Sequence, residues 1–176
     1  DDPAAQAIRQ AARGLIAIAP ARLAHVFYSD SGSTSVEVAL KMALGFWRNQ
    51  DKPRSRIIAL EHAYHGDTVG TMSAGARGVF NAAYEPLLFD VARLPFPEGR
   101  GCDTLAALEE LAKGAAALIV EPLVLGAGGM RLYSAELLCK MKALCERHGT
   151  LFIADEVMTG FGRTGTLFAC EQAGIT

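Results

Sequence analysis

Hydrophobic positions along this chain alternate between helical and strand-like spacing, with short polar breaks between the segments. Helical spacing predicts helices over residues 3–18, 36–47, 103–112 and 134–147. Short apolar runs predict strands over residues 25–28, 56–60, 115–121 and 151–154. This alternation is typical of a parallel sheet whose strands are joined by helices. The pattern therefore predicts an α/β fold.

The helix that contains Val36 and Trp47 has the clearest pattern, with apolar residues at i, i+3, i+4, i+7, i+8 and i+11. Thr34 and Glu37 have the T-x-x-E spacing of a capping box, so we expect them to cap this helix. The last predicted helix runs into Gly149, which suits a C-cap.

The segment Thr150–Gly165 contains an apolar run, then two adjacent carboxylates, then a glycine-rich loop. Residues 151–154 leave no polar face, which predicts a central parallel strand covered on both sides. Asp155 would then lie at the carboxyl end of that strand, where open α/β sheets bind their ligands.

Composition supports one domain, or most of one: 176 residues, 51% hydrophobic and 20% charged. The net charge is -2 with scattered Lys and Arg, which argues against nucleic acid or an anionic membrane as partner. The four cysteines lack C-x-x-C spacing and are expected to be reduced. We find no apolar run long enough to span a bilayer and no signal-peptide pattern at Asp1, although a truncation would hide one. These features favour a cytoplasmic metabolic protein.

Polar groups at three predicted strand ends are candidates for ligand binding. Ser31–Thr34 precedes a helix, whose first N–H groups would suit a phosphate; a capped turn without a ligand is the alternative. The lysine of a P-loop is absent there. Tyr64, His65 and Gly66 follow the second strand and could stack on a planar ring, or simply form a surface loop. His62 and His65 lack a third ligand, so no metal is expected.

Asp155 needs a cationic partner if its strand is apolar. A protonated pyridine nitrogen would serve, and the structural alternatives are an arginine such as Arg163 or a cap on the following turn. Glu121, before Pro122, is a similar but weaker candidate that could merely close its strand.

Gly160, Gly162 and Gly165 spell the dinucleotide fingerprint G-x-G-x-x-G, but the context is wrong. Asp155 and Glu156 stand between the strand and the glycines, where they would repel a pyrophosphate. A nicotinamide or flavin site is therefore not favoured.

A phosphate cradle, an aromatic side chain and an acid facing a ring nitrogen together describe a pocket for pyridoxal 5'-phosphate. Four blocks in this order resemble those of class III aminotransferases: DSGSTSVEVALKMAL, AYHGDTVGTMS, VEPLVLGAGGMR and ADEVMTGFGRTGTLFACEQAG. The resemblance runs from about His25 to the last residue. It implies a three-layer sandwich with a mainly parallel sheet, part of the large domain of a fold-type I enzyme.

The resemblance also implies roles for individual residues. Gly32 and Ser33 would bind the phosphate, Tyr64 would stack on the pyridine ring, Asp155 would pair with the ring nitrogen, and Val157 would press on the opposite face. Including neighbours with less specific roles, nine residues are expected to bind the cofactor: Ser31, Gly32, Ser33, Tyr64, His65, Gly66, Glu121, Asp155 and Val157.

Within the class, the blocks are similar to those of the biotin-pathway branch, which transfers an amino group from S-adenosylmethionine to 8-amino-7-oxononanoate. Leu125 stands where the family usually has glutamine before Gly-Ala-Gly-Gly, which weakens the substrate assignment. An ω-amino acid or diamine aminotransferase is the alternative. The family also suggests a homodimer whose sites are completed across subunits.

None of the five lysines lies in a block that matches the Schiff-base lysine of the family: Lys41, Lys52, Lys113, Lys140 and Lys142. We therefore expect residues 1–176 to be a partial large domain, with the N-terminal segment and the C-terminal small domain absent, and to be inactive in isolation. A noncatalytic binding module is the alternative if the natural protein is this short.

Overall fold

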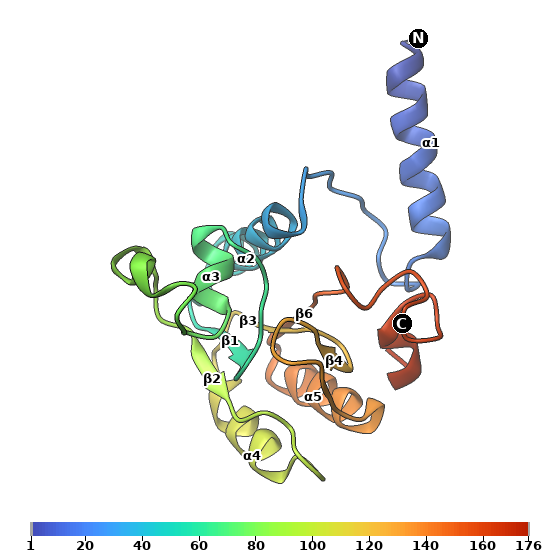
Figure 1. Ribbon diagram of the computed structural model, residues 1–176. Coiled ribbons are helices and arrows are strands. Elements are labelled where there is room, and N and C mark those ends of the chain that lie inside the picture. The colour runs from blue at the N-terminus through green and yellow to red at the C-terminus, as the bar shows by residue number, and fades with distance from the viewer. Residues whose placement is uncertain (1, 176) are drawn as a thin grey trace.

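The computed structural model describes residues 2–175, which form a four-stranded parallel sheet with helices on both faces (Figure 1). The sheet has the order β2-β1-β3-β6, with strands β1 (Ile57–Leu60), β2 (Ala92–Leu94), β3 (Ala117–Val120) and β6 (Leu151–Ala154). The α-helices are α1 (Pro3–Ile18), α2 (Gly32–Asn49), α3 (Val69–Ala74), α4 (Cys102–Leu111) and α5 (Ala135–His148). Two 3₁₀-helices, η1 (Ala82–Leu87) and η2 (Ala169–Ala173), and an antiparallel pair, β4 (Val124–Leu125) and β5 (Arg131–Leu132), complete the fold.

Alternate strand residues build two separate cores, one on each face of the sheet. Ile57 and Ala59 of β1 face α2 and α3, whereas Ile58 and Leu60 face α4 and α5. Trp47 of α2 anchors its layer, since its Nε1–H donates to the Ala116 carbonyl across 2.8 Å. The predicted three-layer α/β sandwich with a parallel sheet is confirmed.

The strand predicted over 25–28 is wrong. Residues 23–29 have no regular secondary structure and pair with no strand among residues 2–175, and Phe27 is 64% exposed. An apolar run becomes a strand only where a neighbouring backbone supplies the ladder of hydrogen bonds. Conversely, β2 and the pair β4–β5 form from segments too short to predict.

The position of β6 also differs from the prediction. Within residues 2–175 this strand lies at one edge of the sheet, paired with β3 alone, and its four residues are only partly buried. Periodicity reports that both faces of a strand are apolar, but it does not report whether both edges are paired.

The predicted capping box of α2 is wrong by one helical turn. Ser31 is the N-cap, its Oγ accepts the Thr34 N–H at 3.1 Å, and Thr34 Oγ1 accepts the Ser31 N–H in return. Glu37 instead reaches a different helix, α3. At the end of α5, the predicted C-cap Gly149 is confirmed, with φ of 63°.

Helix α1 has the predicted bounds, but none of its residues is buried. Figure 1 shows it standing apart from the layers of the sheet. The 3₁₀-helix η2 follows β6 in the chain and packs against α5.

Candidate functional site

The carboxyl ends of β1, β3 and β6 are adjacent in the sheet, and the N-terminus of α2 lies beside them. Together they line a cavity of about 390 Å³. All nine residues predicted from the sequence lie in its wall: Ser31, Gly32, Ser33, Tyr64, His65, Gly66, Glu121, Asp155 and Val157. Two further lining residues, Ala127 and Met158, were not predicted, because they carry no polar group that could have marked them.

The α2 end of the cavity can bind an anion. The first N–H groups of a helix have no intrahelical acceptor, so those of Gly32 and Ser33 are available to a ligand. The next N–H, that of Thr34, is already taken by the side chain of Ser31. The Ser33 hydroxyl accepts a hydrogen bond from the Asp67 N–H at 3.0 Å, which leaves its own proton for a ligand oxygen.

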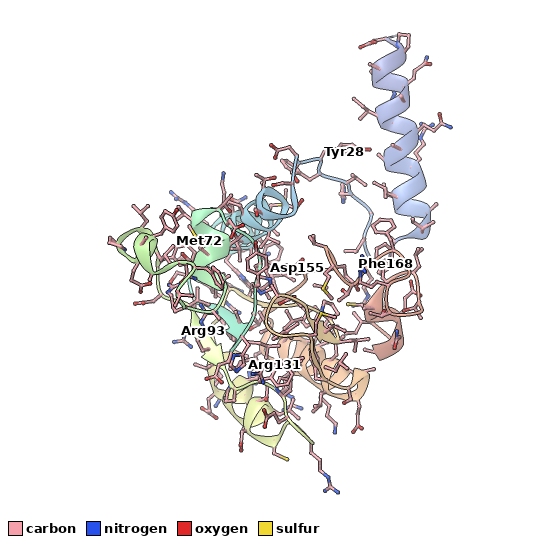
Figure 2. All side chains as sticks on the ribbon, viewed as in Figure 1. Tyr28, Met72, Arg93, Arg131, Asp155 and Phe168 are labelled. Atoms are coloured by element: carbon pink, nitrogen blue, oxygen red, sulfur yellow. The ribbon has the colours of Figure 1, made fainter. Side chains whose placement is uncertain are left out.

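Asp155 lies near the centre of the molecule in Figure 2 and pairs with His65. Its Oδ2 is 2.7 Å from His65 Nδ1, and both side chains are almost wholly buried. Because an ionised carboxylate only accepts hydrogen bonds, Nδ1 carries the proton in this pair. Asp155 Oδ1 accepts the Val157 N–H at 3.2 Å, so the predicted alternative of a cap on the following turn is also present.

The other predicted partner of Asp155 is not found. Arg163 lines a different cavity with Leu123, Val124 and Gln172. His65 was predicted to bind the cofactor, but its bond to Asp155 was not predicted, because 90 residues separate the two and no local pattern joins them. His65 Nε2 is buried and has no hydrogen-bond partner among residues 2–175.

Glu121 connects two loops of the cavity wall. One carboxylate oxygen accepts the Tyr64 N–H at 3.0 Å, and the other accepts the Gly126 N–H at 2.9 Å. Burial raises the pKa of this carboxyl, and the two backbone N–H groups oppose that rise. Glu121 is therefore placed to hold the loops in position, rather than to close its strand before Pro122.

Tyr64 is held in place through both its backbone and its side chain. Its backbone donates to Glu121, and its hydroxyl donates to Asp67 Oδ2 at 2.8 Å, a hydrogen bond that raises the pKa of Tyr64 above its ordinary value of 10.0. A second cavity, of about 540 Å³, shares Tyr64, Gly66 and Ala127 with the first and extends to Arg77 and Asn81.

Three features of the first cavity fit pyridoxal phosphate. The helix N–H groups suit its phosphate, the buried Asp155–His65 pair suits a protonated ring nitrogen, and Tyr64 and Val157 offer an aromatic and an aliphatic side chain for the ring faces. Cavities of about 300–1,000 Å³ are usual for small-molecule sites. None of the five lysines is among the lining residues.

His62 and the three glycines of the G-x-G-x-x-G pattern do not line the first cavity. The His62 ring packs edge-on against Phe96, with ring centroids 6.5 Å apart, outside the first cavity. Gly160, Gly162 and Gly165 lie in a run of turns rather than at a helix N-terminus. Within residues 2–175 no group of three or more His, Cys, Asp or Glu side chains is arranged to hold a metal ion, and no helix is long and apolar enough to cross a membrane.

The sequence matches the family described as aminotransferase class-III over residues 3–176. It is 55% identical over 172 residues to the adenosylmethionine-8-amino-7-oxononanoate aminotransferase of Synechococcus elongatus, covering 92% of this chain and 41% of that protein. The chain thus spans about two fifths of the length of the curated relatives it matches.

Solved structures share the fold. The enzyme of the same name from Methanocaldococcus jannaschii superposes with a TM-score of 0.86 at 35% identity, over 93% of this chain and 38% of that one. An amine transaminase from an uncultivated Pseudomonas species, solved in its PLP-bound form, gives a TM-score of 0.76 at 30% identity, over 99% of this chain and 48% of that one.

Proposed function

Because this chain belongs to the class-III aminotransferase family, we propose that it forms the cofactor-binding part of an enzyme that transfers amino groups with pyridoxal 5'-phosphate. One observation carries the proposal: residues from four separate segments meet in one cavity that presents an anion-binding helix end and a buried carboxylate. When bound, pyridoxal phosphate supplies an electron sink that stabilises negative charge on the carbon next to the substrate nitrogen.

The residues of the chain bind and orient the group. The N–H groups of Gly32 and Ser33 hold the phosphate, and Asp155 holds a proton on the ring nitrogen. His65 fixes the Asp155 carboxylate through the 2.7 Å bond and supplies the proton of that bond. The buried position of both side chains strengthens their interaction with the ring, because little water screens it.

The walls of the cavity restrain the ring from its sides. Tyr64 would cover one face and Val157 the other, while Gly66 lets its loop approach Ser33 closely. Glu121 keeps Tyr64 in place through the backbone N–H. This arrangement would hold the ring in a fixed orientation toward the substrate.

For the substrates, we propose an amino group donated by S-adenosylmethionine and accepted by 8-amino-7-oxononanoate, a step of biotin biosynthesis. The names of the relatives from S. elongatus and M. jannaschii support it. The likeness to an amine transaminase, together with Leu125, supports an ω-amino acid or diamine aminotransferase as the second candidate.

We also propose that residues 1–176 are part of a large domain, with the Schiff-base lysine and a small domain elsewhere in the protein. The coverage of about two fifths of the relatives supports this division. A homodimer, in which a second subunit completes the site, belongs to the same proposal.

The test compares amino transfer to 8-amino-7-oxononanoate from S-adenosylmethionine with transfer from amines to pyruvate or 2-oxoglutarate, in the complete protein. Preference for S-adenosylmethionine would favour the biotin-pathway reaction, and preference for the keto acids would favour the second candidate. Asp155→Asn should lower turnover about a hundredfold or more, because the proton on the ring nitrogen loses its counter-charge.

Glu156→Gln is the matched control for that variant. Glu156 is the neighbouring carboxylate, but it accepts the N–H groups of Ala169 and Cys170 outside the cavity. The turnover of the Glu156→Gln variant should stay within a few-fold of the wild-type value. Equal losses in the two variants would mean that Asp155 has been misassigned, and binding without any amino transfer would favour a noncatalytic module.

A further inference from the structure

Two side chains of α2 bind the segment that follows the Tyr64–Gly66 loop. Ser33 and Glu37 lie four residues apart, so they project from the same face of the helix. Ser33 Oγ accepts the Asp67 N–H at 3.0 Å. Glu37 Oε2 accepts three hydrogen bonds, from Thr68 Oγ1 at 2.6 Å, Gly70 N at 2.8 Å and Thr71 N at 3.2 Å.

Glu37 approaches the backbone of this segment closely at Gly70. A Cβ atom at Gly70 would lie 2.6 Å from each carboxylate oxygen of Glu37. A side chain at position 70 would therefore push the carboxylate away from the N–H groups of residues 70 and 71. Hydrogen bonds to an ionised acceptor are shorter and about twice as strong as neutral ones, which fits the short bond from Thr68.

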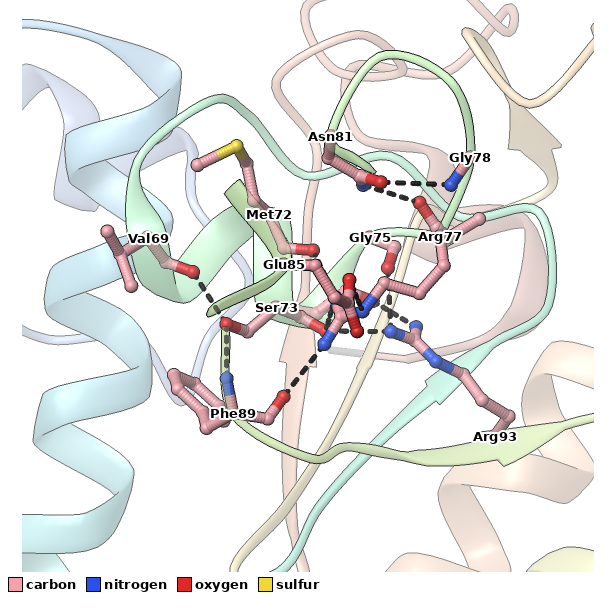
Figure 3. Close-up of polar contacts among 12 residues, drawn as sticks. Val69, Met72, Ser73, Gly75, Arg77, Gly78, Asn81, Glu85, Phe89 and Arg93 are labelled. Carbon is pink, nitrogen blue, oxygen red and sulfur yellow. Dashed lines mark hydrogen bonds and ion pairs between the residues drawn. The ribbon is translucent and has the colours of Figure 1, made fainter. Parts of the chain in front are cut away.

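The opposite end of α3 is held by two arginines (Figure 3). Arg93 of β2 donates to the carbonyls of Ser73 at 2.7 Å and Gly75 at 2.6 Å, and also contacts the Ala74 carbonyl. Burial lowers the pKa of Arg93 to about 10. Arg77 donates to the Met72 carbonyl at 2.8 Å and reaches the Phe89 carbonyl at 2.9 Å.

Helix α3 is thus fixed at its N-terminal end by a carboxylate and at its C-terminal end by guanidinium groups. The six residues of this helix are too few to be stable by themselves, so its position depends on these contacts. The loop that lines the cavity runs directly into it. Any displacement of α3 relative to α2 would move Tyr64 and Gly66 relative to Ser31–Ser33.

We propose that Glu37 is a positioning residue of the cofactor site, which sets the distance between the phosphate-binding end of α2 and the Tyr64–Gly66 loop. The proposal rests on the proposed function. Glu37 is absent from the cavity wall and acts only through Thr68, Gly70 and Thr71. Its loss should therefore weaken contacts with the ring more than contacts with the phosphate.

The test uses Glu37→Ala, which removes all three acceptor bonds, and Glu37→Gln, which keeps an acceptor oxygen in nearly the same place. The probes are 4'-deoxypyridoxine 5'-phosphate, which carries ring and phosphate but cannot link covalently, and inorganic phosphate. Glu37→Ala should bind the ring compound about tenfold more weakly, which corresponds to the loss of about 1.4 kcal/mol. Its affinity for inorganic phosphate should change by less than about threefold, and Glu37→Gln should restore most of the ring affinity.

Leu108→Ala is the control for general loss of stability. Leu108 is fully buried in the core on the opposite face of the sheet. This variant should be less stable than the wild type yet bind both probes normally at a temperature where it is folded. Equal weakening in Leu108→Ala and Glu37→Ala, wild-type binding in Glu37→Ala, or failure of Glu37→Gln to recover would each overturn the proposal.

Hydrogen exchange without any ligand separates this proposal from the proposed function. In Glu37→Ala the amides of residues 64–71 should exchange at least about tenfold faster, while those of β1 and β3 keep their rates. If the wild-type protein does not bind 4'-deoxypyridoxine 5'-phosphate, the proposed function fails. The exchange of the amides of residues 64–67, which Glu37 does not contact directly, still decides whether Glu37 holds the loop. Unchanged exchange there would refute the positioning role.

Discussion

The loop and helix α3 over residues 64–74 and the helix α1 are attached to the molecule in opposite ways. Residues 64–74 form hydrogen bonds with side chains that are distant in sequence: they donate to Ser33, Glu37, Glu121 and Asp155, and they accept from Arg93. Helix α1 has no buried residue, and its hydrogen bond to the rest of the described chain joins Tyr28 Oη to the Ile8 carbonyl across 3.0 Å. Figure 1 shows the same contrast, with α1 projecting away from the sheet.

The contrast shows that forming an element and positioning it have different causes. Helix α1 forms from local signals alone: an Asp2 side-chain cap, a proline at the first position and a run of helix-forming residues that only Gly14 interrupts. Residues 64–74 have weak local preferences and take their shape from tertiary contacts. Changes in this region should therefore be felt across the cavity, whereas changes in α1 should stay local.

The largest effect is expected from Gly66→Ala. Gly66 has φ of 126°, a backbone conformation that strains alanine, and a Cβ there would lie 2.3 Å from Ser33 Oγ and 2.8 Å from Ser33 Cα. Strain and overlap together should lower the free energy of unfolding by about 3 kcal/mol. Urea denaturation of both proteins would measure the difference.

Gly165→Ala is the matched control. Its φ of 101° is also in the region that favours glycine, but nothing lies within 4 Å of the added carbon. Strain alone should cost about 1 kcal/mol. Equal losses at the two positions would mean that the close approach between the Gly66 loop and α2 does not exist in solution.

A smaller effect, a change in the pKa of Tyr64, is expected from Asp67→Asn. The hydrogen bond to Asp67 raises that pKa above 10.0, so the protonated phenol is the form that the folded protein prefers. The stability this bond contributes is fully present below pH 10 and is lost as the pH rises through the raised pKa. In Asp67→Asn the pKa of Tyr64 should move back toward 10.0, and the protein should lose less stability above that pH.

Spectrophotometric titration of tyrosine, with Tyr64→Phe subtracted to isolate the signal, would measure this pKa. Tyr28→Phe serves as the control, because the Tyr28 hydroxyl bonds a backbone carbonyl outside the loop. Superimposable titration curves for the wild type and Asp67→Asn would show that the Tyr64–Asp67 bond does not persist in solution.

The limits of prediction from sequence follow the same division. The bounds of α1, the C-cap at Gly149 and the alternation of strands and helices come from local periodicity, and the structure confirms them. The strand predicted over 25–28 is wrong, because strand pairing depends on a neighbour that the local sequence does not specify.

For the site, residue type and place at strand ends were enough to select eight of the nine cavity residues, and the family resemblance added Val157. The contacts among them were not predictable. The bond from His65 to Asp155 spans 90 residues, and Glu37 was expected to cap its own helix. A carboxylate three residues after a threonine looks the same in sequence whether it turns back to its own helix or reaches another one.

The smallest effect is expected from Ile8→Ala in α1. Ile8 is 55% exposed, and exposed substitutions usually change stability by no more than about 0.5 kcal/mol. Ile58→Ala in β1 is the control, since Ile58 is fully buried and its truncation should cost about 2–5 kcal/mol. Denaturation of the purified protein at two protein concentrations would measure both changes.

A loss of more than about 1.5 kcal/mol in the free energy of unfolding of Ile8→Ala would mean that this face of α1 is buried in solution. A loss of that size requires that most of a large aliphatic side chain is removed from water in the folded protein. If that loss depends on protein concentration, another subunit buries Ile8. If it does not, another part of the same polypeptide buries Ile8.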